Sequence, residues 1–325
     1  MKKINKTPQI SIVVTVKNED KTVNLLLNSL ENQKLIPKEI VVVDGGSTDR
    51  TIDIVREKME KNKKIKLFIE KGTSIAQGRN IGVSNSTSEI IAMTDAGCIA
   101  SPNWLINIVG PILDKDKIGI VAGSYKMIGK SLFQESLKPF LGIPYKLASS
   151  SNFLPSGRSI AFNKITWKKI GGFCEKLEAA GEDTLFNYMA KKKKIMFCFS
   201  KNAVVKWEVP KNLNESFKKF FRYSKGDAQT RIWWHPEKKF GTHNIKIMFI
   251  YFRYLVAVLF LFLSLNHIIF LKILIVLFLL YLTWAAFKNY FKVERKSALI
   301  FSPLIQVSSD IAIMFGFAFG VINKL

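Results

Sequence analysis

The chain has 325 residues, which is enough for one sizeable α/β domain and a further segment. It carries 49 Lys and Arg against 25 Asp and Glu, and the resulting formal net charge of +24 suits an anionic partner such as a lipid leaflet or a phosphorylated substrate. The sequence has no RNA-binding aromatic motif and no basic heptad region, so no nucleic acid is expected as a partner. Its cysteines, Cys98, Cys174 and Cys198, form no CxxC pair, and this spacing predicts neither a disulfide framework nor a zinc site.

Residues 1–210 have the pattern of one α/β domain. Apolar strands alternate with amphipathic helices, which predicts parallel pairing with crossover helices on both faces of the sheet. Strands are expected at residues 11–16, 39–44, 65–70 and 90–95, and helices at 21–33, 51–62, 76–84 and 103–114. The expected fold class is therefore an α/β nucleotide-binding sandwich with a mostly parallel central sheet.

Later in this domain the pattern is looser. Residues 141–157 contain Gly, Pro and Ser, and they predict a long loop that lines a site or moves over it. Further strands are expected at 159–163, 195–199 and 203–207, with a helix at 182–190. The apolar run near the N-terminus, SIVVTV, is too short for a signal-peptide core, so the domain is expected to stay in the cytoplasm.

Residues 211–246 form an amphipathic segment. One helical face is apolar and the other cationic; the apolar positions are Leu213, Phe217, Phe220 and Phe221, and the cationic ones are Lys218, Lys219, Arg222 and Lys225. Such a helix lies in a membrane interface, or it docks onto the sheet, and the pattern leaves both open. We expect the segment to act as an interface or cap.

Residues 247–325 are strongly apolar and predict a membrane domain. Three stretches, 247–265, 268–287 and 298–322, have about the length that a bilayer requires, roughly 20 residues. The loop before the third stretch is cationic and should lie on the cytoplasmic side. Three crossings then predict a multi-pass protein of the cytoplasmic membrane, with residues 1–246 inside and Leu325 outside.

The stretch Ile90–Cys98, IIAMTDAGC, is a buried strand that ends in a carboxylate. In open α/β sheets, ligands bind just beyond the carboxyl ends of the strands, so Asp95 is expected to project into a crevice. A carboxylate there meets a divalent cation or a sugar hydroxyl; a turn aspartate that caps its own backbone is the alternative.

A second strand ends in the same way, at Asp44. Gly45 and Gly46 follow it and allow a flat ring or a phosphate to approach the bare backbone. Asp44 can accept a hydrogen bond from a base N–H, while Ser47 and Asp49 can cap the next helix. A plain turn explains this stretch equally well when it is taken alone.

Taken together, SIVVTVKNE, EIVVVDGGSTDRT, GRNIG, TDAG and GEDTLF stand in an order and spacing that resemble the family 2 inverting glycosyltransferases of the GT-A fold. The resemblance extends over roughly residues 9 to 235. It implies a nucleotide-sugar donor, a divalent cation, Mg²⁺ or Mn²⁺, and a single displacement that inverts the anomeric centre.

The resemblance also implies roles for individual residues. Thr15, Glu19 and Asp44 would hold the base and ribose of the nucleotide, with Ser47 on the same side of the site. Arg79 would pair with the pyrophosphate, which its planar guanidinium suits. Asp95 would bind the metal, which neutralises the leaving group.

For the acceptor side, Asp183 matches the general base of the family, and Glu182 beside it is counted with it as catalytic. A carboxylate at a helix N-terminus stays ionised, which suits a base, although a plain helix start gives the same pattern. Arg222 or Arg231 is expected near the phosphates, in a segment that caps the donor.

Two departures from the family pattern stand out. The family commonly shows Asp-X-Asp, and here Gly97 replaces the second acid, so that metal would depend on Asp95 and on diphosphate oxygens. Processive members carry Gln-X-X-Arg-Trp, and the spacing of Gln229, Arg231 and Trp233 does not match it.

The function expected is that of a metal-dependent hexosyltransferase anchored in the membrane. It would add a sugar to a lipid-linked acceptor of the polyprenyl phosphate type, or to a glycan acceptor, in cell-wall or exopolysaccharide biosynthesis. A processive polysaccharide synthase and a catalytically inactive scaffold are the alternatives.

Overall fold

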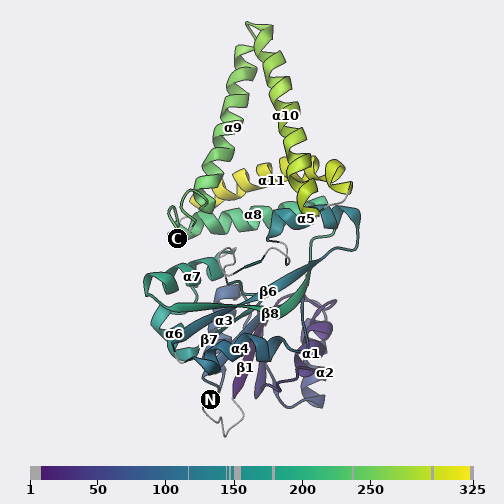
Figure 1. Ribbon diagram of the computed structural model, residues 1–325. Coiled ribbons are helices and arrows are strands. Elements are labelled where there is room, and N and C mark those ends of the chain that lie inside the picture. Colours follow the sequence, from purple (N-terminus) through teal and green to yellow (C-terminus); the bar gives the residue numbers. More distant parts are fainter. Residues whose placement is uncertain are drawn as a thin grey trace. The chain divides into compact units, whose positions relative to one another are not determined.

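The structure is a computed structural model that describes residues 9–115, 117–143, 145, 148–149, 155–177, 180–235, 238–293 and 296–322. The chain divides into two compact units, whose elements are labelled in Figure 1. The α/β unit consists of Met1–Met127, Tyr145–Glu178 and Glu182–Glu208. The helical unit consists of Ile128–Pro144, Ala179–Gly181 and Val209–Leu325.

The α/β unit is built on an eight-stranded sheet among the described residues, in the order β3-β2-β1-β4-β7-β6-β8-β5. The strands are β1 (Ile10–Val16), β2 (Glu39–Asp44), β3 (Ile65–Ile69), β4 (Ile90–Asp95), β5 (Cys98–Ala100), β6 (Ile118–Ile128), β7 (Ile160–Asn163) and β8 (Met196–Glu208). The helices are α1 (Val23–Glu31), α2 (Thr51–Lys61), α3 (Ile75–Asn85), α4 (Trp104–Asp114), α6 (Lys164–Ile170) and α7 (Glu182–Lys192).

The first four strands of this order pair in parallel, as the alternating pattern predicts. Register places Thr15 opposite Asp95 and Val16 opposite Asp44, so the carboxyl ends of β1, β2 and β4 meet at one edge. Beyond β4 the sheet is mixed, because β7 pairs antiparallel with both β4 and β6, and β5 pairs antiparallel with β8. The mostly parallel α/β sandwich expected from the sequence is therefore present.

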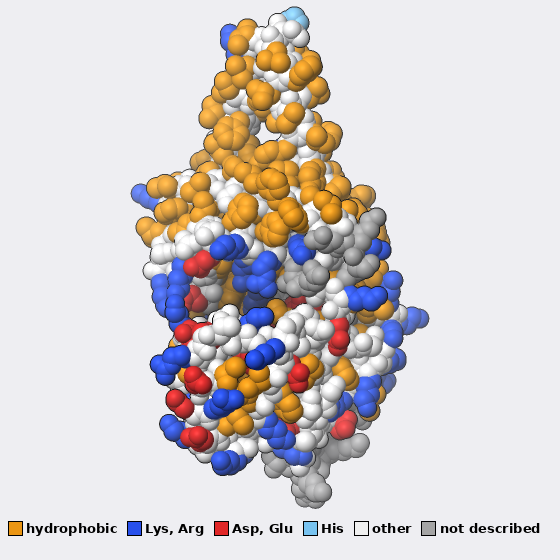
Figure 2. Space-filling model, turned by 180° about the vertical axis from the view of Figure 1, so that it is seen from behind, with side chains coloured by type: hydrophobic (Ala, Val, Ile, Leu, Met, Phe, Trp, Pro, Cys, Tyr) orange, Lys and Arg blue, Asp and Glu red, His pale blue; other side chains and the backbone are white. Residues whose placement is uncertain are grey.

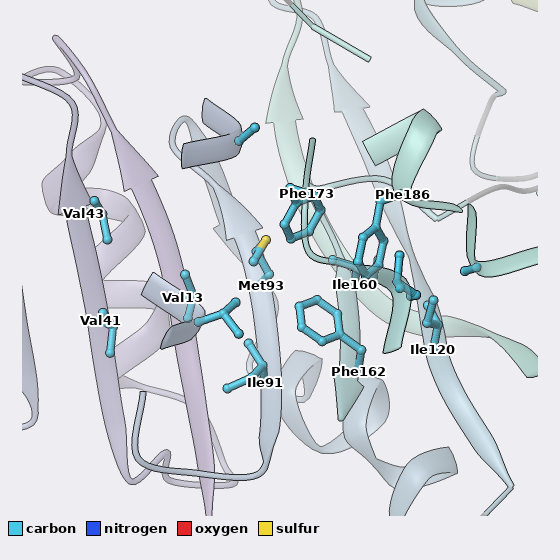
Figure 3. Packing of buried hydrophobic residues seen from close by; sticks show 14 residues of the cluster. Val13, Val41, Val43, Ile91, Met93, Ile120, Ile160, Phe162, Phe173 and Phe186 are labelled. Carbon is cyan, nitrogen blue, oxygen red and sulfur yellow. The ribbon is translucent and has the colours of Figure 1, made fainter. Parts of the chain in front are cut away.

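The core lies where helices cover the sheet. Buried valines and isoleucines of β1, β2 and β4 face the helices, as their unbroken apolar runs require. Figure 3 shows these side chains beside an aromatic group in which Phe173 stacks on Phe186 with ring centroids 4.4 Å apart and Phe162 packs against both. This group fixes the start of α7 and the segment before it.

Three elements differ from the sequence prediction. β8 is one strand rather than two, because the exposed Lys201 and Asn202 continue it without a break. The helix α6 and, in the helical unit, the helix α5 (Leu132–Leu141) were not predicted. Of the predicted loop at 141–157, residues 144, 146–147 and 150–154 lie outside the described part of the chain.

The helical unit contains α5, α8 (Leu213–Thr230), α9 (His243–Leu263), α10 (Ile268–Val293) and α11 (Ser297–Ile322). The helices α9 and α10 form a hairpin, and α11 runs across its base (Figure 1). All three are long and apolar enough to cross a membrane. In Figure 2 apolar side chains cover the visible face of the hairpin.

The amphipathic helix α8 packs with its inner face on α11. Phe220 is buried, and the ring of Phe221 lies 5.6 Å from that of Phe319 in α11. The hydroxyl of Ser224 donates to the carbonyl of Ile313 at 2.7 Å. Within this unit, therefore, the apolar stripe of α8 is covered by protein.

Candidate active site

The edge where β1, β2 and β4 end carries the predicted nucleotide-binding residues. Asp44 is fully buried, and its Oδ1 accepts the N–H groups of Gly46 at 2.8 Å and Ser47 at 2.7 Å. Its Oδ2 accepts the Ser47 hydroxyl at 2.5 Å. Gly46 has φ +89°, a conformation that glycine adopts without strain. Asp44 therefore organises the turn in which it stands.

Ser47 joins this turn to the end of β1, because its Oγ accepts the backbone N–H of Asn18 at 2.8 Å. The N-cap residue of α2 is Arg50, which makes no side-chain cap, but Asp49 Oδ1 accepts the N–H of Thr51, the first residue of the helix, at 3.0 Å. Burial raises the pKa of Asp49, but the hydrogen bonds that its carboxylate accepts from Thr51 and Asp20 lower that pKa by a larger amount.

Thr15 and Glu19 follow on the same side of the sheet. The side chain of Thr15 packs so closely on Gly78 of α3 that a Cβ there would lie 3.0 Å from Thr15 Cγ2. The carboxylate of Glu19 accepts the Thr22 hydroxyl, and its Oε2 lies 4.0 Å from the point where a Cβ on Gly97 would stand. Glu19 is therefore close to the turn that follows Asp95.

Arg79, on α3, is the centre of the site. Its Nη2 donates to Asp95 Oδ1 at 2.6 Å, and its Nη1 donates to Glu182 Oε1 at 2.6 Å. Its side chain is only 3 % exposed, and its Nε has no partner among the described residues. Burial lowers the pKa of the guanidinium, but the charges of Asp95, Glu182 and Asp183 raise that pKa by a larger amount. Arg79 therefore stays charged.

This arrangement depends on Gly157, before β7. A Cβ at that position would overlap the Arg79 guanidinium, so only glycine leaves room for it. The sequence predicts that Arg79 binds pyrophosphate. In the structure both of its terminal nitrogens are already bonded to carboxylates.

The two acids at the start of α7 differ in their surroundings. Glu182 is buried, and burial raises its pKa although the charge of Arg79 acts in the opposite direction. Asp183 is half-buried; its Oδ2 accepts the N–H of Gly157 at 3.1 Å, and its Oδ1 accepts the N–H of Thr184 at 2.7 Å. Asp183 is thus the more accessible carboxylate, and hydrogen bonds orient it.

Asp95 is the one predicted metal ligand, and its side chain is 32 % exposed. No group of three or more His, Cys, Asp or Glu side chains suited to a metal occurs among the described residues. The thiol of Cys98 is no substitute, because burial and the nearby Asp95 raise its pKa to about 12. Mg²⁺ is usually bound by one or two carboxylates together with substrate phosphates, so this donor set fits an ion that a diphosphate also holds.

One residue beside the site was not predicted. The guanidinium of Arg158 lies over the rings of Trp207, 4.2 Å from its centroid, and Tyr125, at 5.3 Å. Its backbone carbonyl accepts the hydroxyl of Thr94, next to Asp95. No motif marks Arg158, because strands distant in sequence supply the aromatic rings that hold it. Arg222 and Arg231 belong to α8 and its C-terminal cap in the helical unit.

A parallel half-sheet whose strand ends carry this cluster of carboxylates is what the family resemblance predicts for this chain. The model of glycosyl transferase family 2 matches residues 11–173, half of the chain, and the chain belongs to that family. The GEDTLF motif with Asp183 lies beyond the matched part.

Among curated proteins, the chain is 28 % identical over 199 residues to the probable glycosyltransferase YdaM of Bacillus subtilis, covering 54 % of this chain and 45 % of YdaM. It is 24 % identical over 161 residues to the putative glycosyltransferase EpsH of the same organism, covering 49 % and 47 %. The chain thus spans about half the length of these relatives.

Solved structures share the fold. The mannosyltransferase PcManGT of Pyrobaculum calidifontis, in complex with GDP-Man and Mn²⁺, superposes with a TM-score of 0.63 at 18 % identity, covering 98 % of this chain and 88 % of PcManGT. Residues 1–349 of TarS from S. aureus, in complex with UDP-GlcNAc, superpose with a TM-score of 0.52 at 22 % identity. This match covers 69 % of this chain and 67 % of the TarS chain. The GT-A fold expected from the motifs is therefore confirmed.

Proposed function

We propose that the protein transfers a sugar from a nucleotide diphosphate donor to an acceptor by a single displacement with inversion, and that Asp183 is the general base. One observation carries the proposal: Arg79 joins Asp95 of the TDAG motif to Glu182 of the GED motif. A carboxylate on the donor side and the residue next to the proposed base are thereby bonded to one side chain.

On the donor side, the base and ribose would be held by Thr15, Glu19 and the turn of Asp44 and Ser47. The bare backbone at Gly45 and Gly46 allows a flat ring to approach. The neighbours crystallised with GDP-Man and UDP-GlcNAc support a nucleotide-sugar donor without fixing its base.

Asp95 would hold Mg²⁺ or Mn²⁺ together with the diphosphate, and the ion would neutralise the leaving group. The structures of PcManGT and of GalNAc-T7, both with Mn²⁺, support this choice of ion. Arg158 lies near Asp95 and is a suitable further cation toward the diphosphate. Arg79 acts as a positioning residue, since its terminal nitrogens bind protein carboxylates.

Asp183 would take the proton of the acceptor nucleophile as that nucleophile attacks the anomeric carbon, while the nucleotide diphosphate leaves from the opposite face. The hydrogen bonds from Gly157 and Thr184 hold the carboxylate in place. Glu182 sets the start of α7 through Arg79 and is not itself the base.

The acceptor in this proposal is a lipid-linked molecule of the polyprenyl phosphate type, at the cytoplasmic face, in cell-wall or exopolysaccharide synthesis. The apolar helices α9, α10 and α11 and the cationic chain support an acceptor presented by a membrane. Arg222 and Arg231 are retained here as a cap near the donor phosphates.

The test is Asp183→Asn, in which the carboxamide keeps the shape of the side chain but cannot take the proton. Transfer should fall by about 10²-fold or more, with donor affinity unchanged. Asp114→Asn, at the exposed end of α4, is the matched control and should keep full activity. A parallel fall in donor affinity would instead assign Asp183 to nucleotide binding.

Product analysis separates the alternatives. Release of a nucleoside diphosphate together with one added sugar of inverted anomeric configuration, read by NMR, supports the proposal. A ladder of long products would indicate a processive synthase. A protein that releases no nucleoside diphosphate from any donor, with every acceptor tried, would be a scaffold.

A further inference from the structure

The three long apolar helices differ in how much of their surface the protein covers. In the most apolar stretch of α9 and of α10 only 6 % of the residues are buried, against 39 % in α11. Helices that face lipid on all sides remain unburied within the protein. The helix α11 therefore has a different environment from the hairpin.

The buried face of α11 is covered by helices that carry many charges. A Cβ on Gly316 would overlap the carbonyl of Phe221, and one on Gly320 would overlap that of Lys225. Small residues four positions apart permit this close approach of two helix backbones. The partner helix α8 bears charged side chains along its length; these are Glu215, Lys218, Lys219, Arg222, Lys225 and Asp227.

At its other end α11 packs on α5. The ring of Phe301 lies 5.9 Å from that of Phe133, and the hydroxyls of Ser136 and Ser297 are 3.4 Å apart. Contacts with α5 and α8 thus extend from Ser297 to Gly320, almost the whole helix. A helix that crosses hydrocarbon cannot be lined along its length by a partner as charged as α8.

The contacts between α11 and the hairpin lie in the half of the hairpin nearer its base and reach the middle of α9 and α10, at Arg253 and Tyr281. The carboxylate of Asp310 is 1 % exposed, and it accepts Arg253 Nη2 at 2.5 Å and the hydroxyls of Tyr254 and Tyr281. The hydroxyl of Tyr251 donates to the carbonyl of Met314 at 2.6 Å. The hairpin beyond these residues is left to its own exposed apolar side chains, in agreement with Figures 1 and 2.

The exposed side chains of α11 form a single apolar stripe. Its most exposed members are Ile300, Leu304, Phe315, Phe319 and Ile322, between 51 % and 75 % exposed. Their successive spacings of 4, 11, 4 and 3 residues are each close to a whole number of helical turns, which places them on one face of the helix. A helix with one apolar face and a protein-covered back is suited to lie in the plane of a membrane surface.

The hairpin has polar groups at both ends. Its tip carries Asn266, His267 and Lys272, all exposed, and its base carries Lys246, Lys288 and Lys292. With 21 and 26 residues, its helices are about 31 and 39 Å long, enough for the roughly 30 Å hydrocarbon core. The more cationic base is the end that belongs on the cytoplasmic side.

We infer that the hairpin crosses the bilayer and that α11 lies in the cytoplasmic interface, with its apolar stripe against the lipid and α8 behind it. The chain then crosses the membrane twice instead of three times. The end of α11 lies on the same side as α8, whereas three crossings would place it on the opposite side.

Depth measurement on the full chain in phosphatidylglycerol–phosphatidylcholine vesicles tests this directly. Nitroxide labels at Ile300, Ile311 and Ile322 should all report a similar shallow depth, about 5–10 Å below the headgroups. Labels on α10 are the matched control: Phe278 should be deep, and Ile269 and Phe287 shallow. Ile311 lying as deep as Phe278, between two shallow ends, would overturn the inference.

A second measurement determines on which side of the membrane each cysteine lies, and it is independent of the depth measurement. Cysteines at Asn214 in α8 and in a short C-terminal extension should react with an impermeant maleimide from the same side, and one at Asn266 from the opposite side. The parent chain, with its native cysteines, sets the background. A C-terminal cysteine labelled from the side of Asn266 would refute the two-crossing arrangement. Neither result bears on the sugar-transfer proposal, which has its own test.

Discussion

Each unit of the molecule contains an arginine that binds a buried or half-buried aspartate, and the two pairs differ in charge balance. Arg79 in the α/β unit contacts Asp95 and Glu182 and lies near Asp183, so carboxylates outnumber it. Arg253 in the helical unit contacts Asp310, which also accepts two tyrosine hydroxyls. In both arginines Nε is buried without a partner among the described residues.

The different charge balance of the Arg79 and Arg253 clusters indicates that the two clusters have different roles. The excess of negative charge around Arg79 provides a place for a cation and a proton acceptor, at the edge of a sheet where ligands bind. The pair in the helical unit is balanced one to one, with the Arg253 guanidinium 4.3 Å from the Tyr281 ring centroid. We expect the first cluster to serve the reaction and the second to hold three helices together.

The largest expected effect comes from removing the aspartate of each pair. Asp95→Ala should abolish transfer, by roughly 10³-fold or more, with the fold intact, because the residue ends a strand and lies outside the core. Asp310→Ala should leave donor turnover per folded molecule within about twofold. It should also destabilise the helical unit by about 1.5–3 kcal/mol, the usual range for hydrogen bonds to a charged group, because Asp310 is buried while Arg253 is 37 % exposed.

Nucleotide release and thermal unfolding of both variants in detergent give the comparison. If Asp310→Ala lowered the turnover of folded protein as much as Asp95→Ala does, the assignment of separate purposes would fail. Near-normal turnover of Asp95→Ala with saturating Mn²⁺ would show that the metal assignment is wrong.

A smaller effect is expected from displacing Arg79 without removing any charge. In Gly157→Ala the new methyl group overlaps the guanidinium, so Arg79 and the carboxylates that it binds must shift. A displacement of about 1 Å in an active site costs on the order of 10²-fold in rate, and transfer should fall by roughly 10- to 100-fold. Donor affinity and transfer rate, measured separately, show which side of the site has moved.

Gly110→Ala is the matched control. Gly110 lies within α4, and nothing stands within 4 Å of the position that its Cβ would take. Alanine there should stabilise the helix slightly, by about 1 kcal/mol, and leave transfer unchanged. Equal losses of transfer in both variants would contradict the role of Arg79 as a positioning residue.

The sequence was informative wherever the relevant contact is local. The strands of the parallel half-sheet follow from continuous apolar runs, and Asp44 and Asp95 follow from their places at strand ends. The role of Arg79 could not be predicted, because its ion pair with Glu182 joins residues 103 positions apart. The glycine that makes room for it, Gly157, belongs to no motif.

The same reason explains the helical unit. Apolar length identifies α9, α10 and α11 but cannot show whether the neighbour of an apolar face is lipid or protein. The neighbour of α11 is protein because Gly316 and Gly320 permit close packing. Glycine is common both in helices that cross a membrane and in helices that pack on protein, so these two residues did not reveal the neighbour in advance. The helix α5 was missed because Pro139 interrupts a short apolar pattern, although its first turn is satisfied by a capping box at Ser131.

The smallest effect on sugar transfer is expected from a third ion pair, which is remote from the active site and sharpens the contrast with Glu182. Glu39 stands at the opposite end of β2 from Asp44, and its side chain is 3 % exposed. Its carboxylate accepts Lys66 Nζ at 2.6 Å, the Ser11 hydroxyl at 2.6 Å and the N–H of Thr87 at 2.5 Å. Burial alone would raise the pKa of Glu39, but these donors lower it from 4.5 to about 2.

Because the pKa is lower in the folded state, Glu39 stabilises the protein above about pH 4.5, and this contribution is lost as the pH falls toward 2. The shift corresponds to about 3 kcal/mol at neutral pH. Glu39→Gln should therefore unfold more easily than the parent at pH 7, and the difference should shrink steadily below pH 4.5. Unfolding midpoints of parent and variant, compared at several pH values, measure it. Donor turnover at pH 7 should not change, because the hydrogen bonds between Asp44 and the turn of Gly46 and Ser47, at the other end of β2, remain intact. A difference in stability that is the same at pH 3 and pH 7 would show that the lost interaction is packing and not charge.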